Sequence, residues 1–191
     1  MAETKTANGA VDEAAEEAKP RRRISKRKAV EQHVRSYFDA MARRDADAMA
    51  EHWSPDGVED VVPVGMLRGR DEIRAFFEST FAALPDVETT LTRLVVGDGA
   101  AAAEWRMAGH HTGAPFQGIE PTGRPVELRG LDLIEVEDGS IASITAYYDT
   151  AGFARQLGML PAEGSAAERA MKGAFNAMTK VRRAVGERTR A

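Results

Sequence analysis

The sequence predicts an α+β fold in which a cone-shaped, curved antiparallel sheet wraps around three N-terminal helices. Two observations predict it. Helical periodicity dominates up to residue 84, and alternating or β-branched segments with hairpin signals between them dominate residues 89–148. Helices followed by a run of strands are typical of an α+β domain. A cone of this kind has a closed end and a mouth, which suits a small apolar ligand.

Three helices are expected in the first half of the chain. The first begins at Ala29 and carries apolar and aromatic residues at 3.6-residue spacing. The second follows Asp45, a residue type that favours the N-cap position. The third runs from about Asp71 to Leu84, and Pro85 ends it because proline cannot continue a helix.

The strands follow a different periodicity. Residues 54–57 (Ser-Pro-Asp-Gly) are expected to break the chain before a short strand over 58–62. Longer strands are expected over residues 89–96, 100–110, 125–137 and 140–148. A short helix or turn over 153–160 and an amphipathic basic helix over 165–184 complete the chain.

Composition excludes several classes of function. The chain has 191 residues, 26 Lys and Arg, 30 Asp and Glu and no Cys, so disulfides, thiol nucleophiles and thiolate metal sites are absent. The net charge of −4 does not suit a polyanion-binding protein, and no specific nucleic-acid partner is expected. No apolar run is long enough to span a bilayer and the first thirty residues carry no hydrophobic signal, so a cytoplasmic location is expected.

Charge divides the chain into an acidic body and two basic ends. Residues 29–164 carry 11 basic and 23 acidic side chains, whereas residues 165–191 carry 7 and 2. We therefore expect a disordered basic arm over 1–28, one domain over 29–160, and a linker with a basic helix over 161–191. The arm is either a solvated tail or a weak contact for an anionic surface. The terminal helix packs on its own body or on a dimer mate, or lies on an anionic membrane.

Asp132 is the leading candidate for a catalytic residue. Alternation along strand 125–137 places it on the face that also carries Val126, Leu128, Ile134 and Val136. A carboxyl group among such side chains loses its water, so its pKa should rise and it should serve as a hydrogen-bond donor or a general acid/base. The alternative is a structural Asp that bonds backbone amides or an arginine.

Asp60 is the second candidate. Val58 and Val62 share its face of the short strand, which would point the Asp60 carboxyl into the same cavity. Two carboxyl groups in unlike environments allow one site to hold an acid and a base at the same pH. The alternative is an exposed Asp at a strand edge.

Tyr37 and His111 are weaker candidates. Tyr37 lies on the apolar stripe of the first helix, as either a core aromatic or a buried hydroxyl with a partner. His111 ends strand 100–110 on the face of Trp105, as either a ligand-orienting group at the mouth or a hairpin residue. Phe76, Trp105 and Phe116 are the aromatic candidates for substrate contact.

Other chemistries lack their motifs. The adjacent His110 and His111 point to opposite faces of a strand, and neither an HExxH motif nor a cysteine cluster is present, so no metal site is expected. Walker-type, dinucleotide and GxSxG motifs are also absent. No cofactor is therefore expected.

Two segments carry a family resemblance. Residues 109–124 (GHHTGAPFQGIEPTGR), then Arg129-Gly130-Leu131-Asp132 and residues 136–141 (VEDGSI), resemble the SnoaL-like polyketide cyclase branch of the nuclear transport factor 2-like superfamily. The resemblance covers about residues 29–160. It implies the cone fold, a homodimer formed through the sheet, an acid/base role for Asp132 and substrate contact for His111.

A further resemblance concerns ketosteroid isomerases. Val58-Glu59-Asp60, Gly65 and residues 73–77 (IRAFF) are similar to the segment of those enzymes that carries the proton-shuttling Asp. It implies Asp60 as that acid, with Tyr37 and a protonated Asp132 as hydrogen-bond donors to an enolate. Ketosteroid isomerases are the established case of a carboxylic acid kept neutral by an apolar site, and the role of Asp132 follows that case.

Two hypotheses follow. The first is a cofactor-independent isomerase or cyclase that enolises a hydrophobic ketone, with Asp60 or Asp132 as base. The second is a non-catalytic module of the same fold that binds a hydrophobic ligand or assembles as a dimer. Converging acids favour the enzyme, whereas a cavity filled by side chains favours the module.

Overall fold

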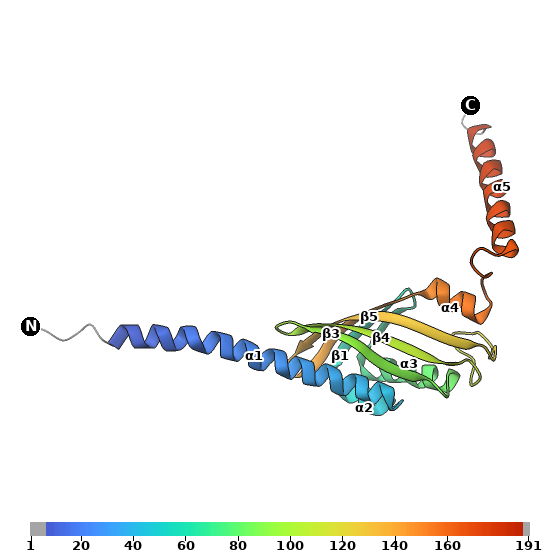
Figure 1. The fold of residues 1–191 in the computed structure, drawn as a ribbon. Coiled ribbons are helices and arrows are strands. Elements are labelled where there is room, and N and C mark those ends of the chain that lie inside the picture. The colour runs from blue at the N-terminus through green and yellow to red at the C-terminus, as the bar shows by residue number, and fades with distance from the viewer. Residues whose placement is uncertain (1–6, 189–191) are drawn as a thin grey trace, which may run out of the picture.

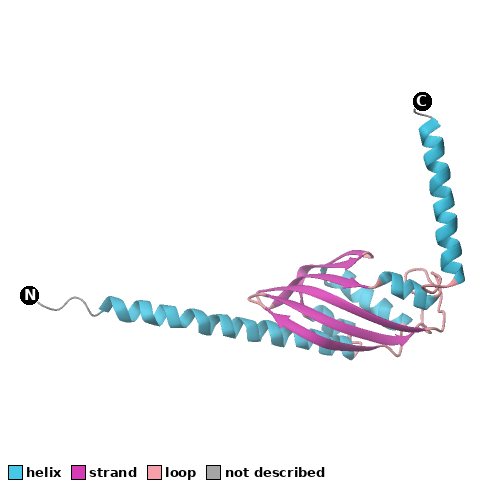
Figure 2. Cartoon of the chain, turned by 45° about the horizontal axis from the view of Figure 1, so that its top comes forward, coloured by secondary structure: helices cyan, strands magenta, loops and turns pink. Residues whose placement is uncertain are grey.

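The structure, a computed structural model, describes residues 7–188 and has the predicted α+β fold. Helices lie against one face of a curved sheet, α1 extends far beyond the sheet at one end, and α5 projects from the other (Figures 1 and 2). The helices are α1 (Ala7–Ala42), α2 (Ala46–Glu51), α3 (Gly69–Ala83), α4 (Thr150–Leu157) and α5 (Ala166–Arg188). The strands are β1 (Trp53–Val62), β2 (Gly65–Arg68), β3 (Glu88–Val96), β4 (Ala100–His110), β5 (Pro125–Glu137) and β6 (Ser140–Tyr148).

The sheet has six strands in the order β2-β1-β6-β5-β4-β3. β4 and β5 pair without interruption from Ala100 opposite Glu135 to His110 opposite Pro125. One pair differs from the expected antiparallel pattern, because β1 returns to the sheet beside β6 and runs parallel to it. This arrangement brings residues of β1 and β5 to the same concave face, on either side of β6.

The second half of α1 supplies much of the core. Its apolar stripe is almost fully buried, as helical spacing predicts. The buried stripe residues are Val30, Val34, Tyr37, Phe38 and Met41.

The first half of α1 corrects the expectation of a disordered arm, since residues 7–28 continue the helix and residues 1–6 lie outside the described part. The buried second half supplies the nucleus, and the Ala, Glu, Lys and Arg residues that predominate over 7–28 are good helix formers, whereas Pro20 is not. Arg23 and Arg27 also donate to the two carboxylate oxygens of Asp98, at 2.6 and 2.8 Å.

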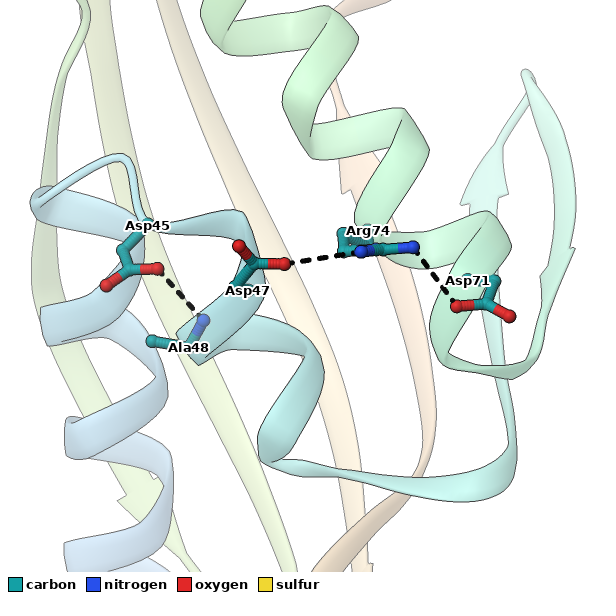
Figure 3. A network of polar contacts seen from close by, with 5 residues as sticks. All are labelled: Asp45, Asp47, Ala48, Asp71 and Arg74. Atoms are coloured by element: carbon teal, nitrogen blue, oxygen red, sulfur yellow. Dashed lines mark hydrogen bonds and ion pairs between the residues drawn. The ribbon is translucent and has the colours of Figure 1, made fainter.

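Polar contacts on the surface join α2 to α3 (Figure 3). Asp45 caps α2 as expected, since its side chain accepts a bond from the Ala48 N–H at 2.9 Å. The guanidinium of Arg74 in α3 reaches Asp47 of α2 at 3.4 Å and Asp71 at 3.3 Å. Exposed ion pairs contribute little free energy each. The inward side of α3 is apolar and buries Ile73 and Phe77.

β1 begins earlier than the sequence predicts. The expected break at residues 54–57 lies within the strand, whose pairing with β6 shifts register between Trp53 and Val58. Gly57 is needed there because a side chain at this position would collide with the ring of Trp53. This longer strand changes which of its acids faces inward.

None of the helices in residues 7–188 is long and apolar enough to cross a membrane.

Candidate active site

A cavity opens on the concave side of the sheet, between α3, α4 and the strands. The volume that the centres of water molecules can occupy is about 80 Å³. One water needs roughly 10–15 Å³ of such volume, so the cavity has room for several waters or for a small ligand. The wall is mostly apolar and includes several aromatic rings. The lining residues are Met41, Glu59, Val61, Phe76, Phe77, Thr80, Leu84, Trp105, Met107, Phe116, Leu128, Asp132, Ala146, Tyr148 and Phe153.

Asp132 lies in this wall, as the alternation along β5 predicts. Only 3% of its surface is exposed, because inward-facing residues of β5 are buried over most of the strand. Its Oδ1 accepts a hydrogen bond from the indole Nε1 of Trp105 at 2.8 Å. Burial raises the pKa of Asp132 to about 7, although the Trp105 bond opposes the change by stabilising the carboxylate.

Gly130 allows Trp105 to reach Asp132. Trp105 in β4 stands opposite Gly130 in β5, and a side chain at 130 would collide with the indole ring. The ring therefore lies across the glycine and directs its N–H toward the carboxyl group two residues along the strand. The Arg-Gly-Leu-Asp segment thus has a structural reason for its glycine.

Glu59, not Asp60, is the second acid in the cavity. The prediction that Asp60 points inward is wrong, since Asp60 is partly exposed and lies outside the cavity wall, whereas Glu59 is 3% exposed. Burial raises the pKa of Glu59 well above its ordinary range, and the charge of Asp132 raises it further. Glu59 Oε2 has no hydrogen-bond partner within the described part of the chain.

The sequence of β1 does not identify Glu59 as the inward acid. Residues 58–62 place valines on both faces, so this short segment does not distinguish Glu59 from Asp60. The strand extends back to Trp53, which is fully buried. Alternation does not carry that inward face from Trp53 to Glu59, because the register shifts between Trp53 and Val58.

Tyr37 is buried behind the acids and does not line the cavity. Burial raises the pKa of its phenol well above the usual value, and the charges of Glu59 and Asp132 add to the increase. The Trp53 indole is close enough to oppose that increase, with ring centroids 6.3 Å apart. Within the described residues, neither Tyr37 OH nor Trp53 Nε1 forms a hydrogen bond of normal geometry. The two groups form a polar layer next to the carboxyls.

The aromatic candidates come together as expected. Phe76, Trp105 and Phe116 all line the cavity. The rings of Phe76 and Phe116 lie 6.2 Å apart, and Phe153 of α4 lies 6.4 Å from Phe116. Helix α3, the loop after β4 and helix α4 therefore each contribute a ring to one apolar wall.

His111 is buried but lies outside the cavity wall, which corrects its expected place at the mouth. Its backbone N–H donates to Arg124 O at 3.0 Å, and its carbonyl accepts from Gly123 N at 2.8 Å. Its ring Nδ1 accepts a long bond of 3.4 Å from the Thr122 N–H. These bonds close the loop over residues 111–124, and that loop carries Phe116 into the cavity.

The two carboxyl groups differ in what they can do chemically. Asp132 has a pKa of about 7, so it exchanges a proton readily near neutral pH. The pKa of Glu59 is raised by burial and then by the charge of Asp132, which favours its protonated form, a hydrogen-bond donor. The wall contains no Lys, Arg or His from the described residues that would hold both groups ionised.

The comparisons with known proteins agree with this fold. The family model for SnoaL-like polyketide cyclases matches residues 31–157. Among solved structures, TsrD from Streptomyces laurentii is 28% identical, with a TM-score of 0.62 over 70% of this chain and 98% of that chain. IdmH from Streptomyces antibioticus, described as a candidate polyketide cyclase, is 26% identical, with a TM-score of 0.58 over 67% and 97%.

A more distant structure supports the fold alone. A candidate SnoaL-like polyketide cyclase from Jannaschia sp. CCS1 is 19% identical, with a TM-score of 0.65 over 71% of this chain and 96% of that chain. A search of curated proteins found no match.

Proposed function

Because this chain belongs to the SnoaL-like polyketide cyclase family, we propose that it is a cofactor-independent acid/base enzyme that enolises a hydrophobic ketone. Isomerisation or ring closure follows from the enolate. The observation that carries the proposal is the pair of buried carboxyls, Asp132 and Glu59, that line one aromatic cavity. Such a pair supplies a base and a hydrogen-bond donor at the same pH.

Asp132 is the proposed base. Its ionised carboxylate takes a proton from the carbon next to the substrate carbonyl, and the electron pair of the broken C–H bond moves to the carbonyl oxygen. A positioned base typically contributes about 10²- to 10⁴-fold to the rate. The Trp105 N–H keeps the carboxylate oriented through its 2.8 Å bond to Oδ1.

Glu59 is the proposed donor to the developing enolate oxygen. A protonated carboxyl in a dry wall stabilises negative charge more strongly than water does, because it is already oriented. The proton on Asp132 then returns to another carbon of the substrate in an isomerisation. In a cyclisation the enolate carbon attacks a second carbonyl, and the new alkoxide takes the proton. Tyr37 is a positioning residue behind these acids.

The proposal is tested by exchange of the α-protons of 2-tetralone in D₂O, followed by NMR. This bicyclic ketone is small, apolar and enolisable, so it probes the chemistry without knowledge of the natural substrate. The protein should accelerate exchange, and Asp132→Asn should remove the acceleration while retaining ligand binding. Glu135→Gln, a change on the outer face of the same strand, is the matched control and should exchange at the wild-type rate.

The alternative is a module that binds a hydrophobic ligand without turnover. The limited volume of about 80 Å³ favours it, because much of the interior is filled by side chains. Binding of 2-tetralone with no accelerated exchange, in both wild type and Asp132→Asn, would support this alternative and refute the enzyme.

A dimer formed through the sheet is also proposed. The outer face exposes Leu131, Leu133 and Tyr147, at 41%, 47% and 47%. Leu131 and Tyr147 are direct cross-strand neighbours, so the apolar surface is continuous across β5 and β6. Sedimentation of Leu133→Glu against wild type tests this contact.

A further inference from the structure

Helix α5 leaves the body of the protein and extends away from the sheet (Figures 1 and 2). Polar contacts hold its first turns to the preceding loop and to α4. Glu168 accepts from Gly164 N at 2.8 Å and pairs with Lys172 at 3.1 Å and with Arg155 at 3.8 Å, and Arg169 donates to Gly164 O. The rest of the helix projects outward. Of the expected alternatives, packing on its own body is therefore excluded, while a dimer mate and an anionic membrane stay open.

The projecting part carries an apolar stripe. Four large side chains on one side are exposed: Met171 by 46%, Phe175 by 67%, Met178 by 54% and Val181 by 62%. Phe175 flanks a row formed by Ala167, Met171, Ala174, Met178 and Val181. The spacing along this row alternates between four and three residues, which is the a/d pattern of helices that pair. A solitary helix gains nothing from such a row, and a second helix buries it.

The positions of the basic residues favour a helix partner over a lipid surface. At about 100° of rotation per residue, Arg169, Lys172, Lys180 and Arg183 lie on the side opposite the stripe. A helix that laid its stripe into a membrane would direct these four cations away from the lipid head groups. In a pair of helices the same cations lie on the outside and stay hydrated.

We propose that α5 binds α5 of a second copy of this chain in an antiparallel pair. The antiparallel register sets Met171 against Val181 of the second copy and Ala174 against Met178 of the second copy, so that small residues face large ones. It also places the two Phe175 rings beside each other near the symmetry axis. A C2 pair of this kind is closed and self-complementary.

Charge distinguishes the antiparallel from the parallel arrangement. In the antiparallel pair, Arg182 lies on the same flank as Glu168 of the second copy. Glu168 is buried and already paired with Lys172 and Arg155, so the attraction between the opposite charges acts at a longer range than a direct ion pair. In a parallel pair, Arg182 would face the uncharged Ala177 and gain no such attraction. The antiparallel direction also places the two bodies at opposite ends of the helix pair, where they do not collide.

The absence of cysteine from the chain makes cross-linking a clean test. The full-length double variant Met171→Cys/Val181→Cys is oxidised and its covalent dimer is measured on a non-reducing gel. Residues 171 and 181 lie about 15 Å apart along one helix, at about 1.5 Å per residue, so no bond forms within a chain. The antiparallel register brings each cysteine to the other type in the second copy, within the roughly 7 Å that a disulfide needs.

The expected result is a covalent dimer from the double variant and none from Met171→Cys alone. Asn176→Cys/Arg183→Cys, on the opposite side of the helix, is the matched control and should remain monomeric on the gel. Cross-linking of Met171→Cys alone would indicate parallel helices and overturn the antiparallel register. No cross-linking of the double variant would overturn the pairing, whatever the sheet contributes to a dimer.

A lipid partner is tested separately with phosphatidylserine vesicles. The proposal expects Phe175→Glu to abolish cross-linking when it is added to the double variant. It expects no difference between wild type and Phe175→Glu in sedimentation with the vesicles. Co-sedimentation that depends on Phe175, with no cross-linked dimer, would assign the stripe to an anionic membrane instead.

Discussion

Strands β5 and β1 each bring one acid into the cavity, but only β5 shows it in its sequence. β5 alternates buried and exposed residues from Pro125 to Glu135, so one apolar face stands out and Asp132 interrupts it. β1 contains Pro55, Gly57 and a register shift, and its valines lie on both faces. An inward acid is therefore recognisable only where the surrounding strand is long and regular. Burial raises the pKa of both Glu59 and Asp132. The protonation of each acid can be tested by changing the pH and by replacing each side chain with its amide.

The largest expected effect is the pH dependence of α-proton exchange. Only the ionised carboxylate of Asp132 accepts a proton, so the rate should rise with pH through about 7, the pKa of Asp132, and then level off. Asp132→Asn should lower the plateau by about 10²- to 10⁴-fold and abolish the rise. Exchange of 2-tetralone followed by NMR across the pH range is the measurement. A rate that is flat in wild type would contradict an Asp132 base.

Stability should change with pH for the same reason. The folded pKa of Asp132, about 7, lies above the ordinary value of 3.8, so the unfolded chain releases its proton first as pH rises. The contribution of Asp132 to the free energy of unfolding should therefore fall between about pH 4 and 7, by roughly 4 kcal/mol at about 1.36 kcal/mol per pH unit. The physical cause is that the folded protein must hold the ionised Asp132 carboxylate away from water at higher pH.

Asp132→Asn should remove the part of this fall that is due to Asp132, because the amide is neutral at every pH and its oxygen can still accept the Trp105 bond. The part that is due to Glu59, whose pKa is also raised, should remain. The variant should be more stable than wild type at about pH 8 and similar at about pH 4. Urea unfolding at both pH values is the measurement. Equal stability of the two proteins at the higher pH would mean that Asp132 is not desolvated in solution.

Glu59→Gln should have a smaller effect than Asp132→Asn. Since the pKa of Glu59 is raised well above its ordinary range, the group is already neutral, and an amide retains a hydrogen-bond donor. The amide is a weaker donor than the carboxyl group, so the loss in exchange should not exceed about tenfold, which corresponds to a whole hydrogen bond of about 1.4 kcal/mol. A loss as large as that of Asp132→Asn would show that Glu59 is ionised and acts as the base.

Much of the fold could be predicted from the sequence, because its periodic segments are long. The strands from Glu88 to Tyr148 and the buried stripe of α1 follow simple alternation or helical spacing. The two ends of the chain could not be predicted in the same way. Residues 7–28 have few apolar residues, and the helix there extends from a nucleus built by residues further along. The direction of α5 depends on the contacts of Glu168 with Gly164 and Arg155, and the spacing of apolar residues does not predict these contacts.

The site shows the same limit at the level of single residues. Phe76, Trp105, Phe116 and Asp132 reach the cavity because each lies on the apolar face of a regular element or in the loop that closes over it. The place of His111 depends instead on backbone bonds to Gly123 and Arg124, which close a loop that is irregular in sequence. Loop closure of this kind is not visible in residue spacing.

The smallest expected effect is that of Asp60→Asn, which tests the comparison of the two strands directly. Asp60 lies on the outer face of β1, paired with Met66 of β2 on one side and Thr145 of β6 on the other, outside the cavity. Its replacement by a neutral amide should leave exchange of 2-tetralone at the wild-type rate. Stability should change by less than about 0.5 kcal/mol, as for most surface substitutions. The adjacent Glu59→Gln is the matched variant, because residues 59 and 60 are neighbours in sequence but point to opposite faces of the sheet. A loss of exchange in Asp60→Asn greater than in Glu59→Gln would mean that β1 in solution presents the opposite face to the cavity.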